Sequence, residues 1–306
     1  MKKNIFLIIL SFFILPFSLS AKTLKVVAST QDLASIAKEI GKEKIKVEFL
    51  CPGFKDPHFV EPLPSQVLKL KKADLVLLVG MELDIWMLSL IDAARNPKIR
   101  YGKKGYLDCS LGIEKLEVPQ GKIDASMGHL HPYGNPHYWV SPLNAKIIAK
   151  NIKERLCQLL PQDCGYFERN LKKFSQKIDK KFKEWKEKLD NFKNKKVVTY
   201  HKSWCYFARD FDLKIVGELE PKPGIPPSYK HLKALVELMK RENVKVILQE
   251  IFYPKKAGKF LSEKTNAKLV IVPNSVGGTK EAKDYFSLID TIVNKLADAF
   301  KNAKAD

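Results

Sequence analysis

Short apolar segments alternate with amphipathic ones along this chain, and that alternation restricts the fold more than any other feature. Residues 23–29 and 45–50 are typical of buried strands, and residues 31–41 between them are typical of a helix. A helix over 64–73 and a strand over 74–80 continue the pattern. Strands that alternate with helices form parallel sheets covered by helices on both faces. We therefore predict an α/β fold.

The same alternation begins again after residue 195, so the two halves of the chain resemble each other. We predict two lobes, each a parallel sheet flanked by helices, over residues 22–160 and 196–306. The second lobe is expected to contain strands at 195–200, 213–219, 244–251 and 267–273, with helices at 203–212, 227–243, 255–266 and from about Thr279 onward.

One long amphipathic helix is predicted between the lobes, over residues 161–195. Apolar residues recur there at spacings of three and four, and no glycine or proline follows Gly165. At about 1.5 Å per residue the helix would be roughly 40 Å long, enough to join both lobes rigidly. Small tilts and loop movements, rather than a flexible hinge, would then govern ligand capture.

The N-terminus has the layout of a secretory signal peptide over residues 1–21. Two lysines precede an apolar run that Pro16 interrupts, and small residues lead to cleavage after Ser20 or Ala21. An uncleaved membrane anchor is the alternative, although the apolar run is shorter than the roughly 20 residues of a spanning helix. Because no cysteine lies at the cleavage point, we expect a free periplasmic protein.

The formal net charge of +20 raises the possibility of a polyanionic partner, either nucleic acid or an anionic membrane surface. The lysines, however, are interleaved with acids along helices, and no aromatic and basic strand motif of an RNA-binding protein is present. A solvated, lysine-rich surface is the favoured interpretation, with no nucleic-acid partner.

Five cysteines in an exported chain indicate oxidising conditions with at least one thiol left over. Cys157 and Cys164 lie where one helix ends and the next begins, a spacing that allows a disulfide. Cys51 and Cys109 each follow an apolar strand, so they are a second candidate pair. Cys205 would then be a free, buried thiol.

Three histidines occupy matching positions at the carboxyl ends of strands or at helix entrances: His58, His137 and His201. Open α/β sheets bind ligands at this edge, so the three would meet in a pocket between the lobes. Neutral imidazole is a good ligand for zinc, and three imidazoles define most of a tetrahedron. Pro57 and Pro136 precede two of them and restrict the backbone. The plainer interpretation is that each is a loop residue beside a helix.

The chain resembles the solute-binding proteins of zinc and manganese ABC transporters over essentially its whole mature length. The resemblance rests on "DPHFVEPLPS", "GMELDIW", "GNPHYWVSP", "TYHKSWCYFARDF" and "PKPGIPPSYKHLKALVELMKRENVKVILQE", in this order. It implies that His58, His137 and His201 bind the metal, and a histidine at the third position is typical of zinc-type members. It also implies a monomeric, non-enzymatic protein that delivers Zn²⁺ to a membrane permease, with Mn²⁺ as the alternative ion.

The fourth coordination position is left open, because the resemblance places Asn274 where relatives often carry aspartate. Water, Asn274 or a loop histidine are the candidates, and Glu250 is either a carboxylate beside the ligands or a structural strand-end residue. His129 and His131 are expected in a mobile loop on the approach to the site, where they collect ions or only line the loop.

Three other functions compete with zinc delivery. A manganese- or iron-binding member of the same family and a surface adhesin are two of them. An exported zinc hydrolase is the third, since catalytic zinc sites also use three histidines, but the chain has no H-E-x-x-H motif and no acid placed as a general base. Ser141 is expected to cap a helix, and His231 to pack on a helix surface.

Overall fold

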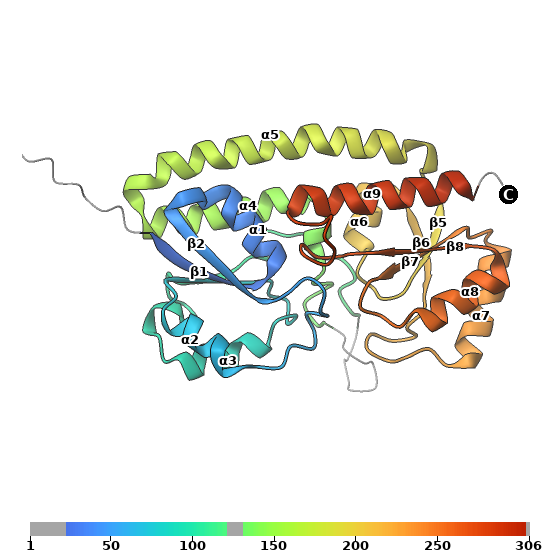
Figure 1. Cartoon of the computed structure of the whole chain (residues 1–306), viewed down its shortest axis with the longest axis horizontal. Coiled ribbons are helices and arrows are strands. Elements are labelled where there is room, and N and C mark those ends of the chain that lie inside the picture. Colours follow the sequence, from blue (N-terminus) through green and yellow to red (C-terminus); the bar gives the residue numbers. More distant parts are fainter. Residues whose placement is uncertain (1–22, 121–130, 304–306) are drawn as a thin grey trace, which may run out of the picture.

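Two parallel four-stranded sheets form the two lobes of the chain, which a computed structural model describes over residues 23–120 and 131–303 (Figure 1). The N-terminal sheet has the order β2-β1-β3-β4, and the C-terminal sheet has the order β6-β5-β7-β8. Every neighbouring pair is parallel, so the predicted fold class is confirmed. The strands are β1 Leu24–Thr30, β2 Ile45–Cys51, β3 Leu75–Leu78, β4 Tyr106–Asp108, β5 Lys196–Thr199, β6 Lys214–Glu218, β7 Val246–Glu250 and β8 Lys268–Val272.

The identical strand order makes the lobes topological copies of each other. In each sheet the first strand of the lobe has the second strand on one side and the third strand on the other. The chain therefore reverses its direction across the sheet at the first strand, and parallel sheets bind ligands at such a switch point.

The helices are α1 Gln31–Gly41, α2 Pro64–Lys71, α3 Trp86–Ala94, α4 Pro142–Leu159, α5 Cys164–Leu189, α6 Cys205–Asp210, α7 Tyr229–Arg241, α8 Lys255–Thr265 and α9 Tyr285–Asn302.

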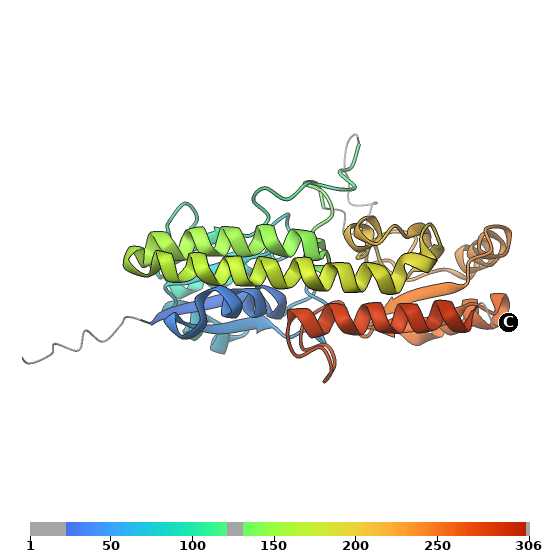
Figure 2. The same ribbon diagram turned by 90° about the horizontal axis from the view of Figure 1, so that it is seen from above.

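Helix α5 lies along both lobes, and α9 lies beside it over the C-terminal lobe (Figures 1 and 2). At its N-terminal half, Asn170 donates to the carbonyl of Ile40 in α1. At its C-terminal half, the Trp185 indole donates to Asp290 in α9. The apolar face of α5 belongs to one core cluster that contains residues of both sheets. The long helix between the lobes is therefore present as the periodicity predicts, and it packs into a core that both lobes share.

The terminal helix begins later than the sequence pattern suggests. Helix α9 starts at Tyr285 instead of near Thr279, because the Asp284 side chain accepts a hydrogen bond from the Ser287 amide and forms a capping box. Helix α3 is a further element that the sequence pattern did not reveal, whereas the strand expected before Cys109 is present as the edge strand β4. No helix within residues 23–120 or 131–303 is both long and apolar enough to cross a bilayer.

One of the two candidate disulfides is present, and the other prediction is wrong. Cys157 and Cys164 are bonded, which joins the end of α4 to the start of α5. Cys51 and Cys109 are both free and buried. Cys51 ends β2 and Cys109 follows β4, and these are the two edge strands of one sheet, so three strand spacings of about 4.8 Å separate the two residues. That is far beyond the reach of a disulfide. Cys205 is free, as expected, but only partly buried.

Candidate metal centre

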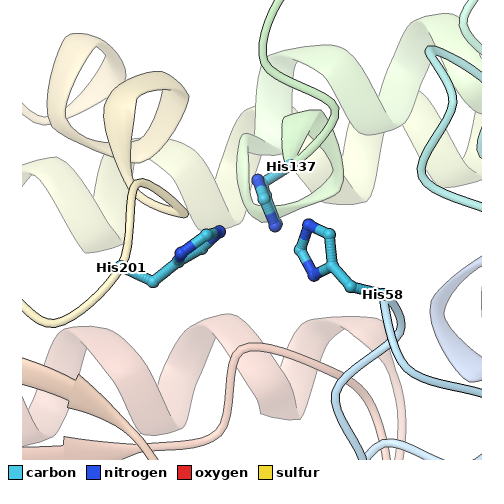
Figure 3. Close-up of side chains that lie close together, drawn as sticks. All are labelled: His58, His137 and His201. Atoms are coloured by element: carbon cyan, nitrogen blue, oxygen red, sulfur yellow. The ribbon is translucent and has the colours of Figure 1, made fainter. Parts of the chain in front are cut away.

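The structure brings together the three histidines that the sequence singles out. His58 comes from the loop between β2 and α2, His137 from the turn before α4, and His201 from the end of β5. Their ring centres form a nearly equilateral triangle with sides of 5.0, 5.2 and 5.1 Å. One nitrogen of each ring lies within 4.8 Å of the other two, and the rings face a common point (Figure 3). This is the only group of three or more metal-ligating His, Cys, Asp or Glu side chains found within the described residues.

A side-chain oxygen of another residue orients each ring through a hydrogen bond with Nδ1, the ring nitrogen that points away from the centre. A hydrogen bond at Nδ1 fixes the tautomer and leaves Nε2 to face the centre, as in most protein metal sites with histidine ligands. The Nδ1 distances are 2.7 Å from His58 to Asp56, 2.9 Å from His137 to Asn135 and 2.7 Å from His201 to Glu220.

Two of these oxygens come from the same local motif, an Asx-Pro-His tripeptide. The side-chain oxygens of Asp56 and Asn135 each accept a hydrogen bond at 3.0 Å from the backbone amide of the histidine two residues later, as well as bonding to its ring. The tripeptides "DPH" and "NPH" are therefore a local sequence signal for both partners, in addition to the prolines that restrict the backbone.

The third partner, Glu220, has no local signal and is placed by strand register. In the parallel pair β5 and β6, Thr199 lies opposite Glu218. Two residues further along each strand, His201 and Glu220 lie side by side at the carboxyl edge, where the Glu220 amide donates to the Tyr200 carbonyl. Nineteen residues separate the pair in sequence, so only the sheet topology unites them.

Glu250 lies on the other side of His201, because β7 is the second neighbour of β5. It is fully buried, and one oxygen accepts a hydrogen bond from the Trp204 indole at 3.0 Å. Burial raises the pKa of Glu250 to about 7, although the nearby His201 opposes this shift. No direct hydrogen bond joins Glu250 to a histidine among the described contacts.

Asn274 is also fully buried, in the turn after β8. The backbone carbonyl of Asn274 accepts a hydrogen bond from the Trp139 indole at 2.7 Å, and the Trp139 ring packs against His137. Both side-chain atoms of Asn274 lack a hydrogen-bond partner within the described part of the chain. Buried amides are rarely unpaired, so this side chain retains the capacity to bind a water or an ion.

His131 lies closer to the site than the approach loop in which the sequence places it. Its Nε2 is 3.1 Å from Nε2 of His58, although its ring centre is 6.3 Å from that of His137. A cavity of about 40 Å³ is lined by His131, His137 and His201 among others, and it is large enough for an ion or a water. His129 falls outside the described residues.

Burial and neighbouring groups shift the pKa values of the site residues in different directions. Burial, together with the other three histidines, holds the pKa of His137 well below its usual range, so the ring is neutral. Burial alone would lower the pKa of His201, but the hydrogen bond to Glu220 and the nearby acids raise it overall. Burial alone would raise the pKa of Asp56, but its hydrogen bond to His58 lowers it overall, so this carboxyl is ionised.

Asp56 and Glu220, rather than Glu250, are the acidic residues in direct contact with the histidine rings. The two carboxylates bond directly to the outer nitrogens of two of the three histidines. They can offset the charge of a divalent ion without contacting it.

Two smaller predictions are confirmed. Ser141 caps α4, since its hydroxyl accepts a hydrogen bond from the Asn144 amide. His231 lies on the surface of α7, and Nε2 of its ring forms a hydrogen bond with the Glu218 carbonyl at 2.9 Å.

Known proteins with the same fold share this chain's length and organisation. The family profile of ZnuA, the periplasmic component A of the zinc-uptake complex, matches residues 26–299. The manganese ABC transporter substrate-binding lipoprotein PsaA of Streptococcus anginosus is 29% identical over 292 residues, covering 91% of this chain and 90% of that protein. The metal ABC transporter substrate-binding lipoprotein SsaB of Streptococcus sanguinis is 28% identical over 296 residues, covering 92% of this chain and 90% of that protein.

Solved structures agree with these relatives. A crystal structure of ZnuA has a TM-score of 0.76 at 25% identity and covers 91% of this chain and 99% of that one. A zinc-bound ZnuA deletion mutant has the same TM-score at 26% identity, covering 91% and 98%. Because the profile spans almost the whole chain, the protein belongs to the ZnuA family of periplasmic metal-binding proteins, the substrate-binding components of ABC transporters.

Proposed function

We propose that this protein captures zinc with high affinity in the periplasm and delivers it to the membrane permease of an ABC transporter. The observation that carries the proposal is the convergence of His58, His137 and His201, with one nitrogen of each within 4.8 Å of the others. Around one zinc ion at 2.0–2.1 Å, tetrahedral nitrogen ligands lie about 3.3–3.4 Å apart. A small movement of His201 toward the two histidines of the N-terminal lobe, with slight rotation of the rings, would bring the three nitrogens to that spacing.

The donor set favours zinc over manganese. Imidazole suits zinc, whereas manganese prefers oxygen ligands, and the three converging residues offer nitrogen alone. The relatives named above as manganese transporter components make manganese the main competitor for this chain. Asn274, a neutral amide, offers less attraction to manganese than a carboxylate would.

His131 is our candidate for the fourth ligand, in preference to water or Asn274. The distance of 3.1 Å between its Nε2 and that of His58 is close to the spacing of two nitrogens on one tetrahedral zinc ion. Its ring stands at the edge of the group, so binding would require it to move toward His137. Four imidazoles would complete a site without any oxygen ligand.

Metal analysis tests the zinc assignment. Protein purified without chelators should contain zinc, and in mass spectrometry under equal competition among zinc, manganese and iron the zinc complex should dominate. Binding of manganese or iron in preference to zinc would overturn the assignment and favour another metal-specific member of the family. Hydrolytic activity of the zinc-loaded protein would instead favour the exported hydrolase, and adhesion without metal delivery would favour the adhesin.

Replacing His131 with alanine should weaken zinc binding by more than about 100-fold, because loss of a group that touches the metal costs more than the 10–100-fold typical of partners that only orient the ligands. Calorimetric titration in competition with a chelator would measure it, and His129→Ala is the control with unchanged affinity. If His131→Ala binds zinc as tightly as the unaltered protein, water or Asn274 fills the fourth position and His131 only lines the approach.

Export precedes this function. We propose that residues 1–21 direct the chain across the inner membrane and are then removed, because their lysines, apolar run and small residues have the layout of a cleavable leader. N-terminal sequencing of the protein from the periplasmic fraction should start at Ala21 or Lys22. We further propose that the protein acts as a monomer until it docks on its permease.

A further inference from the structure

Tyr253 connects the C-terminal lobe to a histidine of the N-terminal lobe. It lies in the loop between β7 and α8, and its hydroxyl donates to Oδ2 of Asp56 at 3.3 Å. The other oxygen of the same carboxylate holds the ring of His58. A continuous chain of hydrogen bonds therefore runs from one lobe, through Asp56, to a side chain of the metal centre in the other.

The ring of Tyr253 is held firmly by its own lobe. It stacks on Tyr200 with the ring centres 4.2 Å apart and the planes 12° from parallel, and Phe252 packs on it edge-on. Tyr200 directly precedes His201, whose ring centre lies 6.0 Å from that of Tyr253. Tyr253 thus moves with His201, while Asp56 moves with His58.

The contact between Tyr253 and Asp56 has room to change. Both residues line a cavity of about 650 Å³ that Glu220 also borders, so no tight packing fixes their separation. The present distance of 3.3 Å exceeds the 2.7–2.8 Å that is usual for a hydroxyl donor. A metal ion that draws His58 and His201 together would also bring the Tyr253 hydroxyl toward Asp56.

We propose that Tyr253 is a positioning residue that couples closure of the lobes on the metal to the orientation of His58. As the lobes approach, the hydrogen bond to Asp56 shortens, which holds the carboxylate and through it the imidazole in the binding geometry. The coupling slows release of the ion, because His58 cannot rotate away until the lobes separate. This inference rests on the proposed function, since it assumes that a metal bridges the two lobes.

The hydroxyl is suited to this task chemically. Burial, together with the charges of Asp56, Glu250 and Glu220, raises the pKa of Tyr253, so the group remains protonated and acts as a donor. Phenylalanine in its place would keep the stack on Tyr200 and lose the donor alone.

The test compares Tyr253→Phe with Tyr200→Phe, which removes the hydroxyl of the other ring in the same stack. Zinc release would be followed by stopped-flow transfer to a chelator, and affinity by competition titration. Tyr253→Phe should release zinc about 10-fold faster or more, within the range typical of partners outside the first shell, with an unchanged association rate. Tyr200→Phe should behave like the unaltered protein, and both metal-free variants should melt at the unaltered temperature.

A second comparison separates positioning from a general structural effect. If Tyr253 acts through Asp56, adding Tyr253→Phe to Asp56→Ala should not accelerate release further. The coupling would be overturned if the two substitutions accelerated release multiplicatively. It would also be overturned if Tyr253→Phe released zinc at the normal rate while the unaltered protein binds zinc tightly. Either result would leave the proposed function intact. Failure of the unaltered protein to bind zinc or another divalent metal would overturn both.

Discussion

Replacing His58, His137 or His201 singly with alanine should weaken zinc binding by more than about 100-fold, or about 2.8 kcal/mol. Each substitution removes one of three converging nitrogens and also deprives an oriented oxygen of its partner. In His201→Ala, the buried carboxylate of Glu220 would lose its contact with the imidazole and keep the hydrogen bond from the Gly224 amide. Competition calorimetry with a chelator of known affinity would measure the loss.

His231→Ala is the matched control for these variants. This histidine lies on α7 and bonds to a backbone carbonyl, so its loss should change the affinity by less than about threefold, under about 0.7 kcal/mol. An alanine variant at His58, His137 or His201 that keeps the unaltered affinity would exclude that residue from the metal site.

Saturating zinc should stabilise the folded protein by about 4 kcal/mol at a thousandfold excess over Kd, because the assembled site exists only in the folded state. For a chain of this size the melting temperature should rise by roughly 6–12 °C at neutral pH. Differential scanning calorimetry with and without zinc would measure the rise. An unchanged melting temperature would count strongly against a metal centre between the lobes.

Acid should remove the stabilisation by zinc, because His201 becomes protonated as the pH falls. Its pKa is raised above the usual 6.5, so it is the histidine that protonates early as the pH falls. A protonated ring cannot bind zinc, so the zinc-dependent rise should be complete well above this pKa and should decline as the pH falls through it. The lowered pKa of His137 keeps that ring available over the same range.

In the metal-free protein, the contribution of His201 to stability should change with pH in the opposite direction. A histidine whose pKa is raised on folding contributes stability below its unfolded pKa of about 6.5, and this contribution is lost as the pH rises through its folded pKa. The pair of His201 and Glu220 therefore stabilises the metal-free protein in mild acid. Calorimetry of both forms across the same pH range should show the two melting temperatures converging as the pH falls. A zinc effect that persists in acid would argue against histidine ligation.

Local sequence was sufficient wherever the responsible residues are close together in the chain. The alternation of strands and helices predicted two parallel sheets, and the uninterrupted apolar periodicity predicted α5. The Asx-Pro-His repeat contained the partners of His58 and His137, because an Asx side chain reaches the amide and ring of the second residue after it. Capping decided the start of α9 in the same local way, although the Asp284 signal was overlooked.

Predictions that depend on distance in space were less successful. Cys51 and Cys109 both follow strands, and nothing in either segment shows that β2 and β4 form opposite edges of one sheet. The position of His131 beside His58 is a contact between two loops 73 residues apart. Glu250 was a reasonable choice for a counter-charge from its strand end, yet the direct partner of His201 is Glu220, on the other neighbouring strand.

The sequence by itself determined the fold class, the long α5 helix and the three histidines that meet, since periodicity and strand ends are properties of neighbouring residues. The tertiary structure alone decided which groups surround those histidines. Glu220 reaches His201 because β6 pairs with β5 in a register that places Glu218 opposite Thr199. Tyr253 reaches Asp56 because the two lobes face each other across the site. Strand order and lobe placement minimise the free energy of the whole packed chain, so no local segment encodes them alone.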